Sequence, residues 1–134
     1  MPPVRTYVAA KIHGVRVTDA SVGYHGSVTI GGDLMHAAGI DPYEQVHVAN
    51  LGTGARWVAY ATPGPDRAFT LNGGDARLGV PGDRCVVTTY CQAQSFDGAN
   101  ILYCTDANAF TLDVYEDPCL CYEPAQRTDG AAGR

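Results

Sequence analysis

The dipeptide Gly26-Ser27 is the place in this sequence where residue types and spacing could carry out unusual chemistry. It ends the run Tyr24-His25-Gly26-Ser27, which lies between two segments rich in strand-forming residues. A serine that follows a glycine can attack the preceding carbonyl group when the turn is strained, and glycine permits the backbone conformation that this attack needs. The resulting ester can eliminate to dehydroalanine and hydrolyse to an N-terminal pyruvoyl group. An ordinary turn explains the same dipeptide, so the dipeptide alone leaves both interpretations open.

Short strands separated by glycine- and proline-rich turns are the elements that must position this dipeptide. Residues 33–39 are expected to form a short helix, with Asp33 as its N-cap and Gly39 as its left-handed C-cap. Many short strands with one or two short helices favour a compact, mainly β fold. The pattern of β-branched and alternating residues predicts strands at residues 4–18, 27–30, 45–49, 55–60, 68–71, 84–91 and 100–104.

The 134 residues are enough for one domain with its own core, which we expect to span residues 1–116. Residues 117–134 are polar and contain proline, glycine and charges, so we expect a flexible tail there. The net charge is −5 and the nine basic residues are scattered, which argues against nucleic acid as a partner. No apolar run approaches the ~20 residues that span a bilayer, and the N-terminus has no signal-peptide pattern. We therefore expect a cytoplasmic protein that does not bind membranes.

The cysteines and histidines are candidate metal ligands, but their spacing does not support a metal site. Five cysteines are an odd number, which argues against a fully paired disulfide framework. Cys119-Leu-Cys121 could be half of a metal or redox site, but no second ligand pair stands at a recognisable spacing. The histidines all lie far upstream, and His36 and His47 are expected at the surface. We expect no bound metal, and a cysteine-based metal or redox protein is a minor alternative.

Several motifs, in order along the chain, resemble the aspartate 1-decarboxylase family. The strongest are residues 11–20, KIHGVRVTDA, followed by residues 24–30, YHGSVTI. The resemblance covers roughly residues 4–104 and implies a double-psi β-barrel that assembles as a homotetramer, with active sites shared between neighbouring subunits. It also leaves room for a maturation factor. The further matching segments are residues 33–40, Gly54-Ala55-Arg56 with Tyr60-Ala61, Asn72-Gly73-Gly74-Asp75-Ala76, and Pro81-Gly82-Asp83.

The resemblance implies a carboxy-lyase made as a zymogen that cleaves itself between Gly26 and Ser27. The cofactor would be a covalent pyruvoyl group derived from Ser27. Its ketone would form a Schiff base with the amine of a small amino acid, by default L-aspartate, and would accept the electrons left when carbon dioxide departs. The product would then be β-alanine, which feeds pantothenate biosynthesis.

The positions that match the family's motifs imply roles for individual side chains. Arg56 would bind a substrate carboxylate through two parallel hydrogen bonds, and Lys11 would add a second positive charge near the same anion. Tyr60 would return a proton to the carbanion. The resemblance places three more residues in the substrate pocket and two supporting residues near the cleavage turn and the site: Asn72, Gly73 and Gly74, and Tyr24 and His13.

Three residues depart from the family's pattern. Ala59 stands where the family has a threonine whose hydroxyl is thought to polarise the glycine carbonyl during cleavage. Thr62 replaces an aliphatic residue, and Asp75 replaces a small apolar residue, so an inward carboxylate would repel an acidic substrate side chain. Two alternatives follow: a related amino acid as the substrate, or an uncleaved, non-catalytic barrel that binds a small carboxylate or regulates an active relative. The segment 103–122 has no counterpart in the family.

Overall fold

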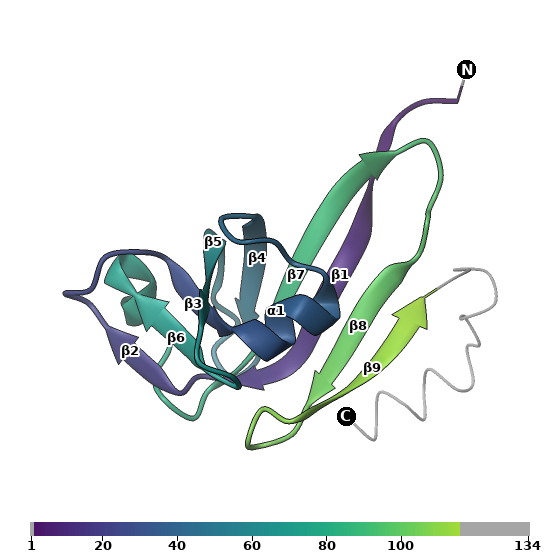
Figure 1. The fold of residues 1–134 in the computed structure, drawn as a ribbon. Coiled ribbons are helices and arrows are strands. Elements are labelled where there is room, and N and C mark those ends of the chain that lie inside the picture. The colour runs from purple at the N-terminus through teal and green to yellow at the C-terminus, as the bar shows by residue number, and fades with distance from the viewer. Residues whose placement is uncertain (1, 116–134) are drawn as a thin grey trace.

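The computed structural model describes residues 2–115, and these residues form a mainly β fold (Figure 1). The prediction of many short strands with a short helix is therefore confirmed, whereas the predicted tail at residues 117–134 lies outside the described residues. Within the described part no helix is long and apolar enough to cross a membrane. In chain order the elements are β1 (Arg5–Arg16), β2 (Asp19–Ser21), β3 (Val28–Gly31), α1 (Gly32–Ala38), β4 (Gln45–Asn50), β5 (Arg56–Gly64), β6 (Phe69–Asn72), the 3₁₀ helix η1 (Gly73–Arg77), β7 (Arg84–Ala93), β8 (Ala99–Cys104) and β9 (Phe110–Tyr115).

The strands form one mixed sheet in the order β2-β6-β3-β5-β4-β7-β1-β8-β9. The pairs β2–β6, β3–β5 and β1–β8 are parallel, and the other neighbours are antiparallel. Figure 1 shows the short strands β2, β3 and β6 gathered on one side, while β1, β7, β8 and β9 extend away on the other. The double-psi closure of these strands stays a prediction.

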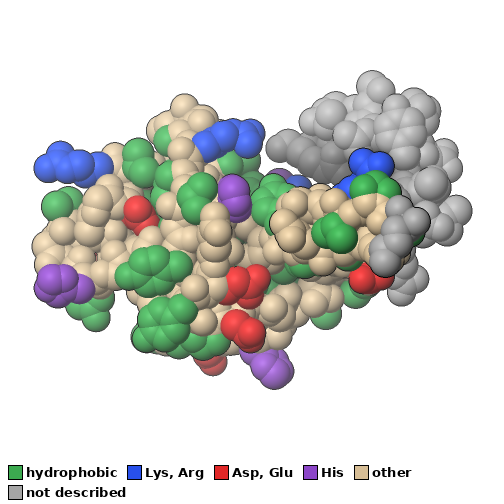
Figure 2. Space-filling view, turned by 90° about the horizontal axis from the view of Figure 1, so that it is seen from above, with side chains coloured by type: hydrophobic (Ala, Val, Ile, Leu, Met, Phe, Trp, Pro, Cys, Tyr) green, Lys and Arg blue, Asp and Glu red, His purple; other side chains and the backbone are tan. Residues whose placement is uncertain are grey.

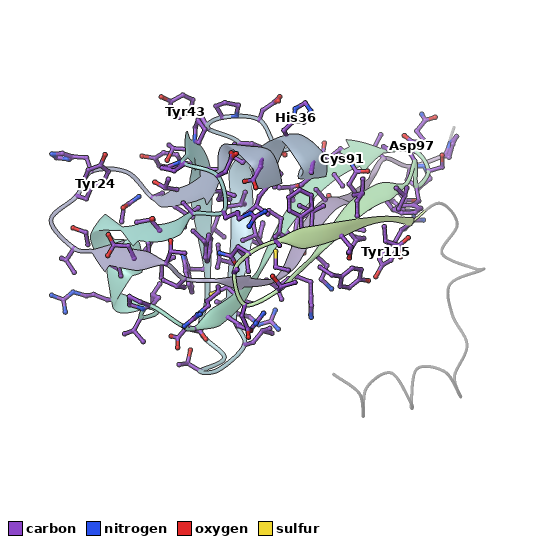
Figure 3. The ribbon with its side chains drawn as sticks, turned by 60° about the horizontal axis from the view of Figure 1, so that its bottom comes forward. Tyr24, His36, Tyr43, Cys91, Asp97 and Tyr115 are labelled. Atoms are coloured by element: carbon purple, nitrogen blue, oxygen red, sulfur yellow. The ribbon has the colours of Figure 1, made fainter. Side chains whose placement is uncertain are left out.

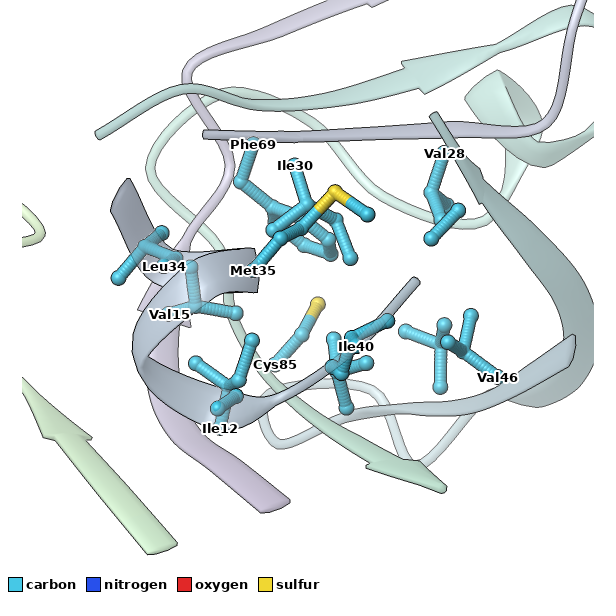
Figure 4. Close-up of a cluster of buried hydrophobic side chains, with 14 of the residues drawn as sticks. Ile12, Val15, Val28, Ile30, Leu34, Met35, Ile40, Val46, Phe69 and Cys85 are labelled. Carbon is cyan, nitrogen blue, oxygen red and sulfur yellow. The ribbon is translucent and has the colours of Figure 1, made fainter. Parts of the chain in front are cut away.

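The core lies where the inner faces of the strands meet α1 (Figure 4). In β4 the side chains of Val46 and Val48 point inward and those of Gln45 and His47 point outward, as the two-residue repeat of a strand requires. Burying each large aliphatic side chain contributes about 1.5–3 kcal/mol to stability. The largest side chains in this cluster are fully buried: Ile12, Ile30, Leu34, Phe69, Leu71 and Leu102.

Helix α1 covers this core and ends where the sequence predicts. Leu34, Met35 and Ala38 are its buried side chains, and the helix packs against β1, β3 and β8. Gly39 adopts a left-handed conformation with φ of 78°, and its N–H is directed at the last carbonyl groups of the helix. A glycine pays no Cβ penalty in this conformation, so the predicted C-cap is confirmed.

The prediction that Asp33 is the N-cap is wrong. Gly31 occupies the N-cap position, and Asp33 lies in the first turn, where a carboxylate is favoured by the helix dipole. Its Oδ1 accepts hydrogen bonds from the backbone N–H of Leu34 at 2.8 Å and of Arg67 at 2.9 Å. Asp33 therefore ties the beginning of α1 to the loop between β5 and β6.

Two strands, β2 and β9, were not expected from the sequence pattern. Strand β2 has three residues, and β9 pairs with β8 along the outer edge of the sheet. Most of the β9 side chains are exposed, so the segment lacks the alternation that identifies a half-buried strand. The strand predicted at residues 100–104 is confirmed as β8, and backbone pairing with it adds the unpredicted β9.

The side chain of Asn108 connects the turn between β8 and β9 to other segments through hydrogen bonds. It is 1% exposed, and its φ of 60° is one that asparagine tolerates better than most residues. Its Oδ1 accepts the N–H of Arg16 at 2.7 Å. Its Nδ2 donates to the carbonyl groups of Arg16 and Arg67, both at 2.9 Å. One side chain thus links three segments that are distant in sequence.

Replacing Asn108 should lower the stability of the fold. We expect Asn108→Ala to reduce the free energy of unfolding by about 2–3 kcal/mol, because buried backbone groups lose their partners and alanine disfavours positive φ. Asn108→Gly should lose less, since it removes only the hydrogen bonds. Urea unfolding followed by circular dichroism measures both. The exposed β9 substitution Thr111→Ala is the control, and equal stability of Asn108→Ala and this control would contradict the role of Asn108.

Candidate active site

Ser27 comes directly before β3, between residues of the two neighbouring strands β5 and β6. Val28 pairs with Ala61 of β5 in a parallel register and with Leu71 of β6 in an antiparallel register. The N–H of Asn72 donates to the carbonyl of Ser27 at 2.9 Å. This double pairing brings the residue after Leu71 and the residue before Ala61 against Ser27.

The hydroxyl of Ser27 is buried and has two polar contacts. The side chain is 8% exposed. Its Oγ donates to Oδ2 of Asp75 at 2.7 Å and accepts the backbone N–H of Tyr60 at 3.3 Å. The contact from η1 fixes the direction of the hydroxyl proton, and the contact from β5 supplies a donor to the oxygen.

Gly26 joins this buried serine to an exposed loop. Its φ of 115° lies in the region that only glycine adopts easily, as expected for the residue before the serine. Tyr24 and His25 are exposed on the same loop, and Tyr24 lies at the opposite end of the molecule from Tyr115 (Figure 3). The predicted supporting residue Tyr24 therefore projects from the loop into solvent.

Because Gly73 has no side chain, the carbonyl group of Gly26 can lie close to the beginning of η1. A Cβ at Gly73 would lie 3.3 Å from the carbonyl oxygen of Gly26 and 3.4 Å from that of Tyr24, and its φ is 58°. A side chain here would crowd both oxygens and strain the backbone. Gly73 is thus placed against the Gly26-Ser27 bond, whereas nothing lies within 4 Å of a Cβ at Gly74.

Asn72 is buried beside the same bond and is held by a short series of hydroxyl groups. Its Nδ2 donates to Oγ1 of Thr29 at 2.9 Å, and the hydroxyls of Thr29 and Thr62 lie 3.3 Å apart. Thr62 in turn donates to the carbonyl of Val28 at 3.2 Å. Thr62, which the sequence marks as a departure, therefore supports Asn72 through Thr29.

Tyr60 presents its backbone to Ser27 and its ring to the solvent side of β5. Its side chain is 42% exposed and stacks with Tyr43, with ring centroids 6.3 Å apart and an angle of 29° between the rings. Tyr43 is held there by its N–H, which donates to the carbonyl of Ala61 at 2.6 Å. The sequence does not indicate Tyr43, because nothing in the spacing of its turn relates it to Tyr60.

Arg56 lies on the same face of β5 as Tyr60, because the two residues are four positions apart and alternate residues of a strand share a face. It lines a hollow of about 230 Å³ over β5, β4 and β7, together with His47, Trp57, Val58 and other residues of these strands. The face that Figure 2 presents carries its Lys and Arg side chains at separate places. Arg56 itself is exposed at the beginning of β5.

Lys11 and His13 lie on β1, which is separated from β5 by β7 and β4. Lys11 pairs with Thr88, Thr88 pairs with His47, and His47 pairs with Val58. Cross-strand partners share a face, so Lys11 faces the same side of the sheet as Arg56 without being its neighbour. His13 lies against Tyr103, with ring centroids 5.9 Å apart. One copy of the chain thus groups Gly26, Ser27, Tyr60, Asn72 and Gly73 but leaves Lys11 and His13 apart.

The two other departures from the expected pattern differ in their placement. Asp75 lies in η1 and contacts the Ser27 hydroxyl directly, a contact that the sequence does not predict. Ala59 is 7% exposed and belongs to the apolar core cluster, so this position presents no hydroxyl. The structure therefore places a carboxylate, and not an alcohol from β5, next to the serine.

The described cysteines are free thiols and lie outside this group. Burial, with a smaller effect of the Asp83 carboxylate, raises the pKa of the Cys85 thiol to about 12. Burial likewise raises the pKa of Cys104 to about 11, and the nearby Arg84 opposes this shift. Both thiols are protonated at neutral pH and are poor nucleophiles. Among residues 2–115 no three side chains of the metal-binding types are grouped to hold an ion.

Comparison with known proteins gives one consistent result. The model of the aspartate decarboxylase family matches residues 4–110. An aspartate 1-decarboxylase of Acaryochloris marina is 47% identical over 93 residues, which are 68% of this chain and 71% of that protein. That of Syntrophobacter fumaroxidans is 46% identical over 99 residues, 72% and 77% of the two chains. That of Dehalococcoides mccartyi is 39% identical over 108 residues, 76% and 87% of the two chains.

Proposed function

Because this chain belongs to the aspartate decarboxylase family, we propose that it removes the α-carboxylate of L-aspartate to give β-alanine and carbon dioxide. It does so after cleaving its own backbone between Gly26 and Ser27. Aspartate 1-decarboxylases are carboxy-lyases, and the relatives that are 39–47% identical to this chain over the aligned residues carry that name. The arrangement around Ser27 is the observation that carries the proposal.

The contacts of Ser27 suit a serine that attacks the preceding carbonyl. The positive φ of Gly26 and the absence of a side chain at Gly73 let the scissile carbonyl pack closely against η1. The Ser27 hydroxyl is held by Tyr60 and Asp75 in a largely buried position. Water therefore has little access to the hydroxyl and competes little with it as a nucleophile. A group formed from Ser27 would remain in this enclosed position. The pyruvoyl group supplies a carbonyl that accepts the electron pair left by departing carbon dioxide.

Arg56 binds a carboxylate of the substrate. A planar guanidinium forms two parallel hydrogen bonds with a carboxylate, which fixes the orientation of the substrate as well as its position. Arg56 is exposed on the Tyr60 face of β5, so both side chains are available to the same ligand. Tyr60, whose ring is stacked on Tyr43, donates a proton to the carbon that has lost carbon dioxide.

A second copy of the chain completes the site. Lys11 lies three strands from Arg56 in one copy, so the second cation reaches the substrate from a neighbouring subunit of a homotetramer. Val58 of β5 and Tyr90 of β7 are large exposed apolar side chains on the Arg56 face of the sheet. Exposed apolar groups that share one face are typical of subunit interfaces. The free thiols of Cys85, Cys91 and Cys104 suit a reducing compartment such as the cytoplasm.

One observation favours a second function, that of an uncleaved barrel which binds a small carboxylate. Ala59 lies in the core and offers no hydroxyl to the Gly26 carbonyl. An oxyanion donor contributes roughly a hundredfold or more to a rate, so its loss could leave the chain intact. In that case Arg56 would still bind an anion in the hollow over β5, but no carbonyl cofactor would form.

Decarboxylation by the purified full-length protein tests the proposed function. We expect carbon dioxide and β-alanine from L-aspartate, at a higher rate than from other amino acids in a panel, and no product from Ser27→Ala, which cannot form the carbonyl group. Carbon dioxide release and product chromatography measure both. Faster turnover of another amino acid would identify a different substrate. No turnover of any amino acid would favour the binding protein.

Substitution of Arg56 tests its role in holding the carboxylate. We expect Arg56→Ala to lower kcat/KM by roughly tenfold to a hundredfold, because a charged hydrogen-bonded pair contributes about 1.5–3 kcal/mol. Arg56→Lys should recover only part of this loss, since lysine keeps the charge without the fork. Steady-state kinetics measure the change, with the exposed Arg5→Ala of β1 as the control. Unchanged kinetics in Arg56→Ala would show that another group binds the substrate.

A further inference from the structure

The contact between Asp75 and Ser27 is not accounted for by the proposed reaction with substrate. The Oγ of Ser27 donates to Oδ2 of Asp75 at 2.7 Å, a distance typical of a strong hydroxyl hydrogen bond. The backbone N–H of Tyr60 approaches the same Oγ at 3.3 Å from β5. The hydroxyl proton therefore points at a carboxylate, and the oxygen is held by a separate donor.

The backbone brings Asp75 to this place although it is 48 residues from Ser27 in sequence. Strand β6 is paired with β3, and the N–H of Asn72 donates to the Ser27 carbonyl. The chain then turns at Gly73 into η1, and the carbonyl of Asp75 accepts the N–H of Leu78 at 3.0 Å. The turn thus positions the Asp75 carboxylate over the serine through backbone contacts that do not involve its side chain.

We propose that Asp75 is the base that activates Ser27 for cleavage of the Gly26-Ser27 bond, an inference that rests on the self-cleavage proposed above. The Ser27 Oγ forms a bond to the carbonyl carbon of Gly26 while its proton passes to Asp75. When the carbon–nitrogen bond breaks, the proton returns from Asp75 to the departing amine of Ser27. The products of this step are an ester between Gly26 and the Ser27 oxygen and a free Ser27 amine, and Asp75 is again a carboxylate.

The geometry suits a base more than a structural contact. A general base must lie within hydrogen-bond reach of the proton that it removes, and Asp75 does. The carbonyl oxygen of Gly26 lies beside Gly73, two residues before Asp75, so the base and the attacked bond share one turn. Removing a positioned base lowers a rate by roughly a hundredfold to ten-thousandfold. Such a change is large enough to separate loss of the base from modest changes in packing.

The rate of chain cleavage, measured without substrate, tests the role of Asp75. Full-length chains are made by pulse-labelled cell-free synthesis, and the conversion of one chain into two fragments is followed on denaturing gels. We expect Asp75→Asn to cleave roughly a hundredfold more slowly than the wild type or worse, because the amide accepts the hydrogen bond but cannot take the proton. Asp19→Asn removes an exposed carboxylate that accepts the N–H of the next residue in β2, and this variant should cleave at the wild-type rate. Ser27→Ala gives the uncleaved reference.

A second variant separates a chemical role from a structural one. Asp75→Ala should also cleave slowly, and added formate should accelerate it about tenfold or more, because a small carboxylate can occupy the vacated space and act as the base. Failure of formate to accelerate Asp75→Ala, or cleavage of Asp75→Asn within about threefold of the wild type, would overturn the role of Asp75 while leaving self-cleavage intact. A wild-type chain that is never cut would overturn the proposed self-cleavage itself, and with it this inference.

Discussion

The pairing of β3 with β5 on one side and β6 on the other is the constraint on which the site depends. Val28 is paired in both directions, so the residue before it has no freedom to move away from the strand ends around it. Ser27 is consequently held between the backbone of Tyr60 and that of Asn72. Gly26 must then connect a rigid strand to an exposed loop within one residue, and it does so with a positive φ.

The same pairing determines which side chains can act together. Strand alternation directs Arg56 and Tyr60 to the outer face of β5 and Ala59 to the core. The end of β6 and the turn after it place Asn72 and Asp75 on the other side of Ser27. The hydroxyls of Thr29 and Thr62 hold Asn72 in place. Lys11 belongs to the far part of the sheet, so one copy of the chain groups the residues proposed for cleavage but holds Lys11 apart from Arg56. The proposed assembly reconciles these two facts.

The sequence predicted the parts of this arrangement that depend on local pattern. Alternation located most strands, a glycine located the end of α1, and the Gly26-Ser27 dipeptide with its flanking motifs indicated the family. It did not predict the contact of Asp75 with Ser27, because that contact depends on how β6 lies beside β3 and on the turn at Gly73. Tyr43 was missed because its stacking on Tyr60 depends on how the turn before β4 lies against β5. Strand β9 was missed because pairing with β8, and not burial of alternate side chains, creates it.

The central claim is that the chain cleaves itself between Gly26 and Ser27. The mass of the purified full-length protein after denaturation tests this claim most directly. The account predicts two chains that separate between Gly26 and Ser27, with the larger about 17 Da lighter than a chain beginning with an ordinary serine, because an amine has been replaced by a carbonyl. A single uncut chain that persists through prolonged warm incubation would contradict the account.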